Sequence, residues 1–125
     1  MTRARLRTGQ IAEDLTAARL AAAGWWILAR NARTRQGEID IVARDRRTLV
    51  FVEVKGMRAG TARGPERPIL AIGPRKQLRV RRLATAWMAA HRDLPHYEAI
   101  RFDAIGVTLD GADALVHFEH IEGAF

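Results

Sequence analysis

Two short stretches rich in Ile and Val, residues 38–44 and 48–55, are separated only by a short charged turn. Runs of this length and composition predict two β-strands joined as a hairpin. An even-length turn is then centred between Arg46 and Arg47. This hairpin constrains the fold more than any other feature, because its register decides which charged residues of the two strands lie side by side.

The register predicted by this turn brings two acidic side chains together. Counting outward from the turn, Asp40 lies opposite Glu53, and Glu38 lies opposite Lys55. Directly opposed residues have Cβ atoms roughly 4.5–5.5 Å apart, and like charges there are destabilising. The Asp40 and Glu53 pair therefore needs a cation between the carboxylates, or a proton on one of them.

A hard divalent ion such as Mg²⁺ would meet this need, because it takes oxygen ligands. Asp40 and Glu53 would be the ligands, with the Val54 carbonyl as a further oxygen. Lys55 would position or deprotonate a water molecule, or neutralise the charge that develops on a phosphate. Glu13 could add a ligand or position water. The set fits metal-assisted hydrolysis of a phosphodiester bond.

An ordinary structural role explains each of these residues separately. Glu38 and Lys55 could form a cross-strand ion pair, Asp40 could cap a turn, and Glu53 could pair with an arginine. Two facing acids beside one of only two lysines in the chain favour the metal site over this alternative.

The rest of the pattern predicts helices over residues 8–23 and 74–90, and strands over residues 25–30, 99–109 and 114–121. The order is α-β-β-β-α-β-β in a single domain, residues 1–125. The first helix is rich in Ala and has little polar surface, so we expect it to pack on more than one side and partly enclose Glu13. Residues 56–73, rich in Gly and Pro, predict a ligand-contacting loop.

The charge of the chain is basic and uneven. Lys and Arg number 21 against 14 Asp and Glu, a net charge of +7, and 19 of the 21 are arginine. The acidic excess lies after residue 90, which predicts one strongly positive surface for a polyanion, either nucleic acid or an anionic membrane. A merely solvated basic surface, from a genome that favours Arg codons, is the alternative. The residues expected to contact nucleic acid are Arg58, Arg63, Arg75, Lys76 and Arg79.

Two absences narrow the function classes. The chain has no cysteine, which excludes disulfides, thiol nucleophiles and Cys-ligated zinc. No apolar run approaches the ~20 residues that span a bilayer. We therefore expect a cytoplasmic protein without a membrane partner.

Several short motifs together resemble a known family. They are Gly9-Gln-Ile-Ala12-Glu13, Asn31-Ala-Arg33, Gly37-Glu38-Ile39-Asp40, Val50-Phe51-Val52-Glu53-Val54-Lys55, Lys76-Gln77, Arg101-Phe102-Asp103 and Ala124-Phe125. In this order they resemble the bacterial YraN-like family of uncharacterised proteins. That family is similar to the restriction-endonuclease-like PD-(D/E)xK nucleases, and closest in style to archaeal Holliday junction resolvases.

The resemblance implies a restriction-endonuclease-like α/β fold, a central mixed five-stranded sheet flanked by helices, with a Mg²⁺ (or Mn²⁺) site. Carried over, the catalytic residues are Glu13, Asp40, Glu53 and Lys55, of which the three acids hold the metal. Secondary candidates are Glu38 and Gln77, the latter similar to a helix glutamine of related nucleases.

The sequence departs from the family pattern at two positions. Ile39 replaces the proline that precedes the aspartate in resolvases, and Arg58 comes one residue later than the usual arginine. The second departure concerns the path of the chain after Lys55 rather than the site.

Three functions remain open. The first is a Mg²⁺-dependent endonuclease for branched or structured DNA in repair or recombination. We expect it to form a homodimer, because symmetric cutting of two strands needs two sites related by a two-fold axis. The second is a nucleic-acid-binding module of the same fold without catalysis. The third is a basic interaction subunit that docks on an acidic protein.

Overall fold

The computed structural model describes residues 2–60 and 67–125. Its elements are α1 (Arg3–Ala22), β1 (Trp26–Thr34), β2 (Gly37–Asp45), β3 (Thr48–Arg58), the 3₁₀ helix η1 (Pro68–Ala71), α2 (Pro74–Ala90), β4 (Ala99–Leu109) and β5 (Leu115–Ile121). The predicted α/β class and the order α-β-β-β-α-β-β are confirmed.

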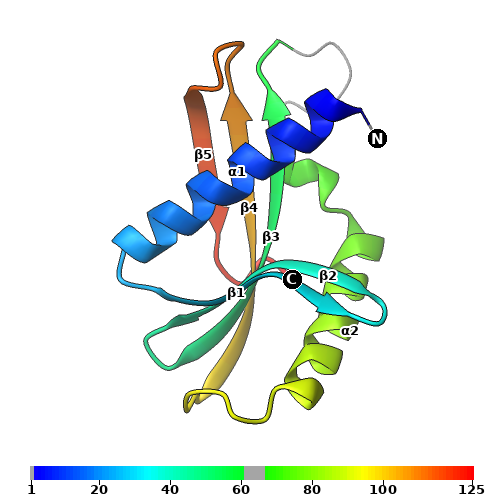
Figure 1. The fold of residues 1–125 in the computed structure, drawn as a ribbon, viewed down its shortest axis with the longest axis vertical. Coiled ribbons are helices and arrows are strands. Elements are labelled where there is room, and N and C mark those ends of the chain that lie inside the picture. The colour runs from blue at the N-terminus through cyan, green and yellow to red at the C-terminus, as the bar shows by residue number, and fades with distance from the viewer. Residues whose placement is uncertain (1, 61–66) are drawn as a thin grey trace.

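The five strands form one mixed sheet in the order β1-β2-β3-β4-β5. Neighbouring strands are antiparallel except β3 and β4, which are parallel. A parallel pair needs a crossover connection, and η1 with α2 supplies it. Figure 1 shows α1 crossing one face of the sheet while α2 lies beside the other. This is the mixed sheet flanked by helices that the resemblance implies.

Each face of the sheet carries its own core. On one face, Ala12 and Leu20 of α1 pack against Val50 and Val52 of β3. On the other face, Val80, Leu83 and Trp87 of α2 pack against Phe51 and its neighbours. The central strand β3 is therefore covered on both sides, which fixes its path and the position of every residue on it.

Helix α1 packs on one side only, so the prediction of packing on several sides is wrong. Its buried residues, Thr8, Ala12, Thr16, Ala17 and Leu20, form one stripe. The small side chains instead allow α1 to approach β3 closely. A Cβ placed on Gly56 of β3 would lie only 2.8 Å from the Ala12 Cβ. The helix thus sits almost directly on the strand that carries Glu53.

The predicted loop over residues 56–73 contains more regular structure than expected. Strand β3 continues to Arg58, because it pairs with β4 along its full length. Further on, η1 packs over β4, where a Cβ on Gly106 would lie 3.1 Å from the Ile69 nitrogen. Arg63, a predicted nucleic-acid contact, lies outside the described residues.

The hairpin register is confirmed where the strands pair, from Asp45↔Thr48 to Ile41↔Val52. Before Ile41, at its N-terminal end, β2 pairs only with β1, and Glu38 lies opposite Arg33. The expectation that Glu38 lies opposite Lys55 is therefore wrong. Strand twist separates β2 from β3 at this point, and the tight β1–β2 turn keeps Glu38 paired with β1.

Candidate functional site

Two predicted acids meet where β2 separates from β3. Asp40 of β2 accepts a hydrogen bond from the Val54 N–H at 2.8 Å through Oδ2. The neighbouring Glu53 of β3 is buried, its side chain 8% exposed. The N–H and C=O of one strand residue point to the same side, so the Val54 carbonyl also faces Asp40. One small region thus gathers two carboxylates and a backbone oxygen.

Burial and mutual repulsion disfavour ionisation of this pair. Burial raises the pKa of Glu53 to about 7, and the negative charge of Asp40 beside it adds to the rise. Burial also raises the pKa of Asp40, although the hydrogen bond from Val54 opposes the increase. At a pH where two exposed acids would both be ionised, this site therefore has too little positive charge to stabilise two carboxylates.

Part of the missing charge comes from a residue predicted to contact nucleic acid. Lys76 of α2 approaches Glu53, with Nζ 3.2 Å from Oε1. Its charge lowers the pKa of both Glu53 and Asp40, without cancelling the effect of burial. The sequence offered no signal for this contact, because the two residues are far apart in the chain and meet only through the packing of α2.

Glu13 of α1 faces the same region from the other side of the sheet. It is half-buried, as predicted, and its Oε1 is buried without a hydrogen-bond partner among the described residues. Burial and, to a smaller extent, the charge of Asp40 raise the pKa of Glu13 to about 7, although the charge of Arg30 opposes the rise. A buried, unpartnered carboxylate oxygen costs free energy unless a cation or water satisfies it.

Lys55 lies two residues after Glu53 on β3, so the two side chains point to the same face. Its side chain is exposed. Within residues 2–60 and 67–125, no hydrogen bond or ion pair holds it. Lys55 is thus a compact cation at the edge of the site that is free to meet a ligand.

The secondary candidates have structural partners. Glu38 forms an ion pair with Arg33 at 3.3 Å on the exposed end of the β1–β2 hairpin. The Gln77 side-chain amide donates to the Ile72 carbonyl at 3.0 Å and so ties α2 to the end of η1. Neither contact brings these residues to the carboxylate pair.

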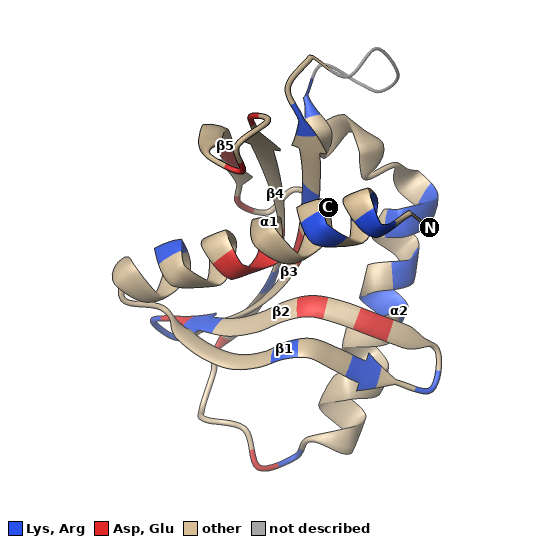
Figure 2. Ribbon diagram, turned by 45° about the horizontal axis from the view of Figure 1, so that its top comes forward, with Lys and Arg blue, Asp and Glu red and all other residues tan. Residues whose placement is uncertain are grey.

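The predicted basic contacts fall into two groups. Arg75 and Arg79 lie on α2 near Lys76, where Figure 2 shows basic segments along the first half of the helix. Arg58, at the end of β3, instead donates to Thr8 and pairs with Asp113. Arg58 therefore joins α1 to the β4–β5 turn in addition to any role towards a ligand.

The donor set fits a hard divalent cation. All the available atoms are oxygens: two adjacent carboxylates, the Val54 carbonyl, and the unpartnered Oε1 of Glu13. No three His, Asp or Glu side chains of the described residues form a group that could hold a metal by themselves. Mg²⁺ does not require one, because it usually binds one or two carboxylates plus waters and substrate phosphate.

The comparisons with known proteins agree with the resemblance seen in the sequence. The family described as "Uncharacterised protein family UPF0102" matches residues 12–107. A UPF0102 protein of Parafrankia sp. (strain EAN1pec) is 48% identical over 122 residues, which cover 95% of this chain and 96% of that protein. One from Streptomyces griseus subsp. griseus is 46% identical over 120 residues, 96% of this chain and 97% of that protein.

The chain therefore belongs to the UPF0102 family, and the YraN-like resemblance is confirmed. A third relative, a UPF0102 protein of Anaeromyxobacter dehalogenans (strain 2CP-C), is 47% identical over 111 residues, 88% of this chain and 79% of that protein. Neither helix in the described part of the chain has the length and hydrophobicity needed to cross a bilayer.

Proposed function

We propose that the protein is a metal-dependent endonuclease that hydrolyses phosphodiester bonds of branched or structured DNA in repair or recombination. The observation that carries this proposal is the pairing of partly buried Asp40 with buried Glu53, whose pKa values are both raised. Two adjacent acids that repel each other in a dry site are suited to share a divalent cation.

Each residue of the site has a distinct task in this reaction. Asp40 and Glu53 would hold Mg²⁺ or Mn²⁺, and Glu13, which does not form a three-acid metal group with them, would position the attacking water. The ion would supply Lewis acidity towards the phosphate and lower the pKa of the attacking water. Lys55, exposed beside Glu53, would donate hydrogen bonds to the phosphate oxygens as their charge develops. Water would attack phosphorus and give up one proton to the surrounding water, the bond to the leaving oxygen would break, and that oxygen would take up a proton.

Lys76 serves the site before the metal arrives. Its ammonium group contacts Oε1 of Glu53, one of the carboxylates that would hold a cation. The contact keeps a buried carboxylate charged and in place, so Lys76 acts as a positioning residue. The Lys76 side chain is half exposed, so it could turn towards a phosphate if a bound cation took over the charge of Glu53.

The surroundings of the site suit a polyanionic substrate. Helix α2 carries Arg75, Lys76, Arg79, Arg81 and Arg82 and no acidic residue. Phosphate contacts of this kind give salt-dependent binding that does not depend on sequence. A second copy of the chain would place a second site against the opposite strand of a branched substrate, so we expect a homodimer on DNA.

Cleavage assays on a panel of linear, nicked, flapped and four-way DNA test the proposal. We expect cutting with Mg²⁺ or Mn²⁺ and none with EDTA. Asp40→Asn keeps an acceptor for the Val54 N–H but removes a charge, and should reduce cutting by on the order of a hundredfold or more. Lys55→Ala should cost a similar factor while leaving binding largely intact.

Matched controls separate chemistry from folding. Glu38→Gln removes a nearby exposed acid that pairs with Arg33, and should leave the cleavage rate within about twofold. Full cutting by both Asp40→Asn and Lys55→Ala would contradict the proposed site. Salt-sensitive DNA binding without cleavage of any substrate would favour the non-catalytic module, and absence of binding at low salt would favour the protein-docking subunit.

A further inference from the structure

A groove on the α2 face of the sheet contains two pockets divided by one side chain. The first pocket has a volume of about 410 Å³ and lies between α2 and the start of β4. The second, about 430 Å³, lies between η1, the start of α2 and the middle of β4. Phe125 lines both. Each volume falls within the ~300–1,000 Å³ typical of small-molecule sites.

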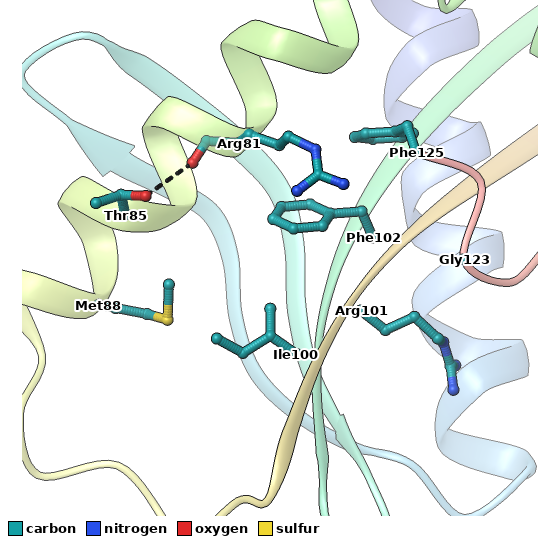
Figure 3. A pocket seen from close by; sticks show the side chains of 8 residues that line it. All are labelled: Arg81, Thr85, Met88, Ile100, Arg101, Phe102, Gly123 and Phe125. Carbon is teal, nitrogen blue, oxygen red and sulfur yellow. Dashed lines mark hydrogen bonds between the residues drawn. The ribbon is translucent and has the colours of Figure 1, made fainter.

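The first pocket has an aromatic wall with a cation against it. The rings of Phe102 and Phe125 lie with their centroids 5.6 Å apart. The Arg81 guanidinium lies 4.6 Å above the Phe102 ring, and Figure 3 shows it next to both rings. Met88 and Ile100 complete the apolar side. Phe102 is covered by Phe51 and Arg81, so a planar ring could stack here on the outer face of the Arg81 guanidinium or on Phe125.

The second pocket borders the carboxylate pair. Its floor includes Ala104 of β4, which pairs with Glu53 of β3. Adjacent strands lie about 4.8 Å apart, so the pocket begins one strand from the proposed catalytic acid. Gln77, which follows Lys76 on α2, forms part of the wall. A group held in this pocket is therefore next to the phosphate that the site would cleave.

The charges around the groove favour an anionic chain with flat, apolar substituents. No acidic residue of the described part of the chain lines either pocket. Arg101, whose backbone borders the first pocket, turns its guanidinium to the opposite face, where it pairs with Asp103. Arg81 and the basic side of α2 are left beside the groove. A predominantly apolar second pocket, and a first pocket of mixed polar and apolar surface edged by Arg81, match nucleobases linked by phosphates.

We infer that this groove binds an unpaired segment of a nucleic-acid strand, with one base in each pocket on either side of the Phe125 ring and the phosphates towards Arg81 and α2. The inference rests on the proposed function and narrows its substrate class. Bases paired inside a duplex cannot enter the pockets, so the substrate needs a single-stranded stretch next to the bond that is cut.

Binding measured without metal tests this inference separately from cleavage. A short fluorescently labelled oligonucleotide is titrated in EDTA, and compared by anisotropy with an oligonucleotide of equal length made of abasic units. Both carry the same phosphate charge, so any difference reports the bases. We expect the abasic strand to bind on the order of tenfold more weakly.

Variants assign that difference to the groove. Phe125→Ala should remove the preference for bases, whereas Phe118→Ala, a ring under Arg19 on the opposite face, should retain it. Arg81→Gln should weaken binding several-fold, and Arg19→Gln should not, although each guanidinium lies over a ring at a similar distance of 4.6 or 4.4 Å. Circular dichroism checks that each variant is folded.

Three results would overturn the inference: equal binding of normal and abasic strands, equal losses in the variants of both faces, or no binding of any single strand. None of these decides whether the protein is a nuclease. Conversely, absence of cleavage with retained, Phe125-dependent binding would overturn the proposed function and leave the groove assignment standing.

Discussion

Two buried acidic sites on the sheet have opposite electrostatic character. Asp103 of β4 is fully buried, and its carboxylate accepts hydrogen bonds from Arg101, from His120 and from the Gly123 N–H. Burial alone would raise its pKa, but the bonds from His120 and Arg101 outweigh burial, and the pKa of Asp103 is lowered. At Asp40 and Glu53, burial prevails and the pKa of each acid is raised.

The difference shows which acids already have enough hydrogen-bond donors within the protein. Asp103 has enough donors within the chain, so it stabilises the structure by joining β4 to β5 and the C-terminal segment. The carboxylates of Asp40, Glu53 and Glu13 have fewer donors than charges. An acid that costs stability in the protein alone is the better candidate for a ligand.

The largest expected effect comes from removing the satisfied acid. Asp103→Ala leaves Arg101 and His120 without their shared partner, and should lower the free energy of unfolding by about 3 kcal/mol or more. Urea denaturation measures this change. A loss below about 1 kcal/mol would show that Asp103 does not stabilise the fold through its contacts with Arg101 and His120.

Asp40→Asn should act in the opposite direction. It removes one of two repelling charges, that of a partly buried acid beside buried Glu53, and keeps an acceptor for Val54, so metal-free protein at pH 8 should gain about 1–2 kcal/mol. The same urea titration measures the gain. Destabilisation by a comparable amount would mean that Asp40 is already satisfied by the fold, as Asp103 is.

The pH dependence of stability should reflect the acids with raised pKa. Between about pH 4.5 and 7, the folded state holds protons on Glu53 and Glu13 that the unfolded state has released. Stability of metal-free protein should therefore decrease as pH rises through this window. Thermal melting in EDTA measures the trend.

Added Mg²⁺ should reverse that trend, because it binds the ionised carboxylates and stabilises the folded state by mass action. We expect a larger rise in Tm at pH 8 than at pH 5. A rise independent of pH, or one retained in Asp40→Asn, would place the ion elsewhere.

The smallest effect should come from an exposed acid with a surface partner. Glu38 pairs with Arg33 at 3.3 Å in an exposed position. Glu38→Gln should change the free energy of unfolding by less than about 0.5 kcal/mol, because exposed ion pairs contribute little. A change as large as that of Asp40→Asn would show that Glu38 belongs to the buried pair.

Local patterns were enough to predict much of the fold. Two runs rich in Ile and Val, together with the short even-length charged turn, predicted the β2–β3 register, and the boundaries of α2 and β4 match the expected residues 74–90 and 99–109. The proximity of Asp40 to Glu53 follows directly from that register.

Features that depend on tertiary packing could not be predicted in the same way. The separation of β2 from β3, which moves Glu38 to Arg33, depends on sheet twist and on competition between two neighbouring strands. The contact between Lys76 and Glu53 joins residues far apart in sequence through the packing of α2. The pockets on either side of Phe125 likewise exist only once the C-terminal segment lies against β4, where the Ala124 N–H donates to the Phe102 carbonyl.

A crystal structure with Mn²⁺, located by its anomalous scattering, tests the central comparison most directly. We predict a peak within about 2.5 Å of carboxylate oxygens of both Asp40 and Glu53, with Lys76 displaced from Glu53, and no peak at Asp103. A peak bound elsewhere, or an unchanged contact between Lys76 and Glu53 at saturating Mn²⁺, would contradict the assignment of this acidic pair as a metal site.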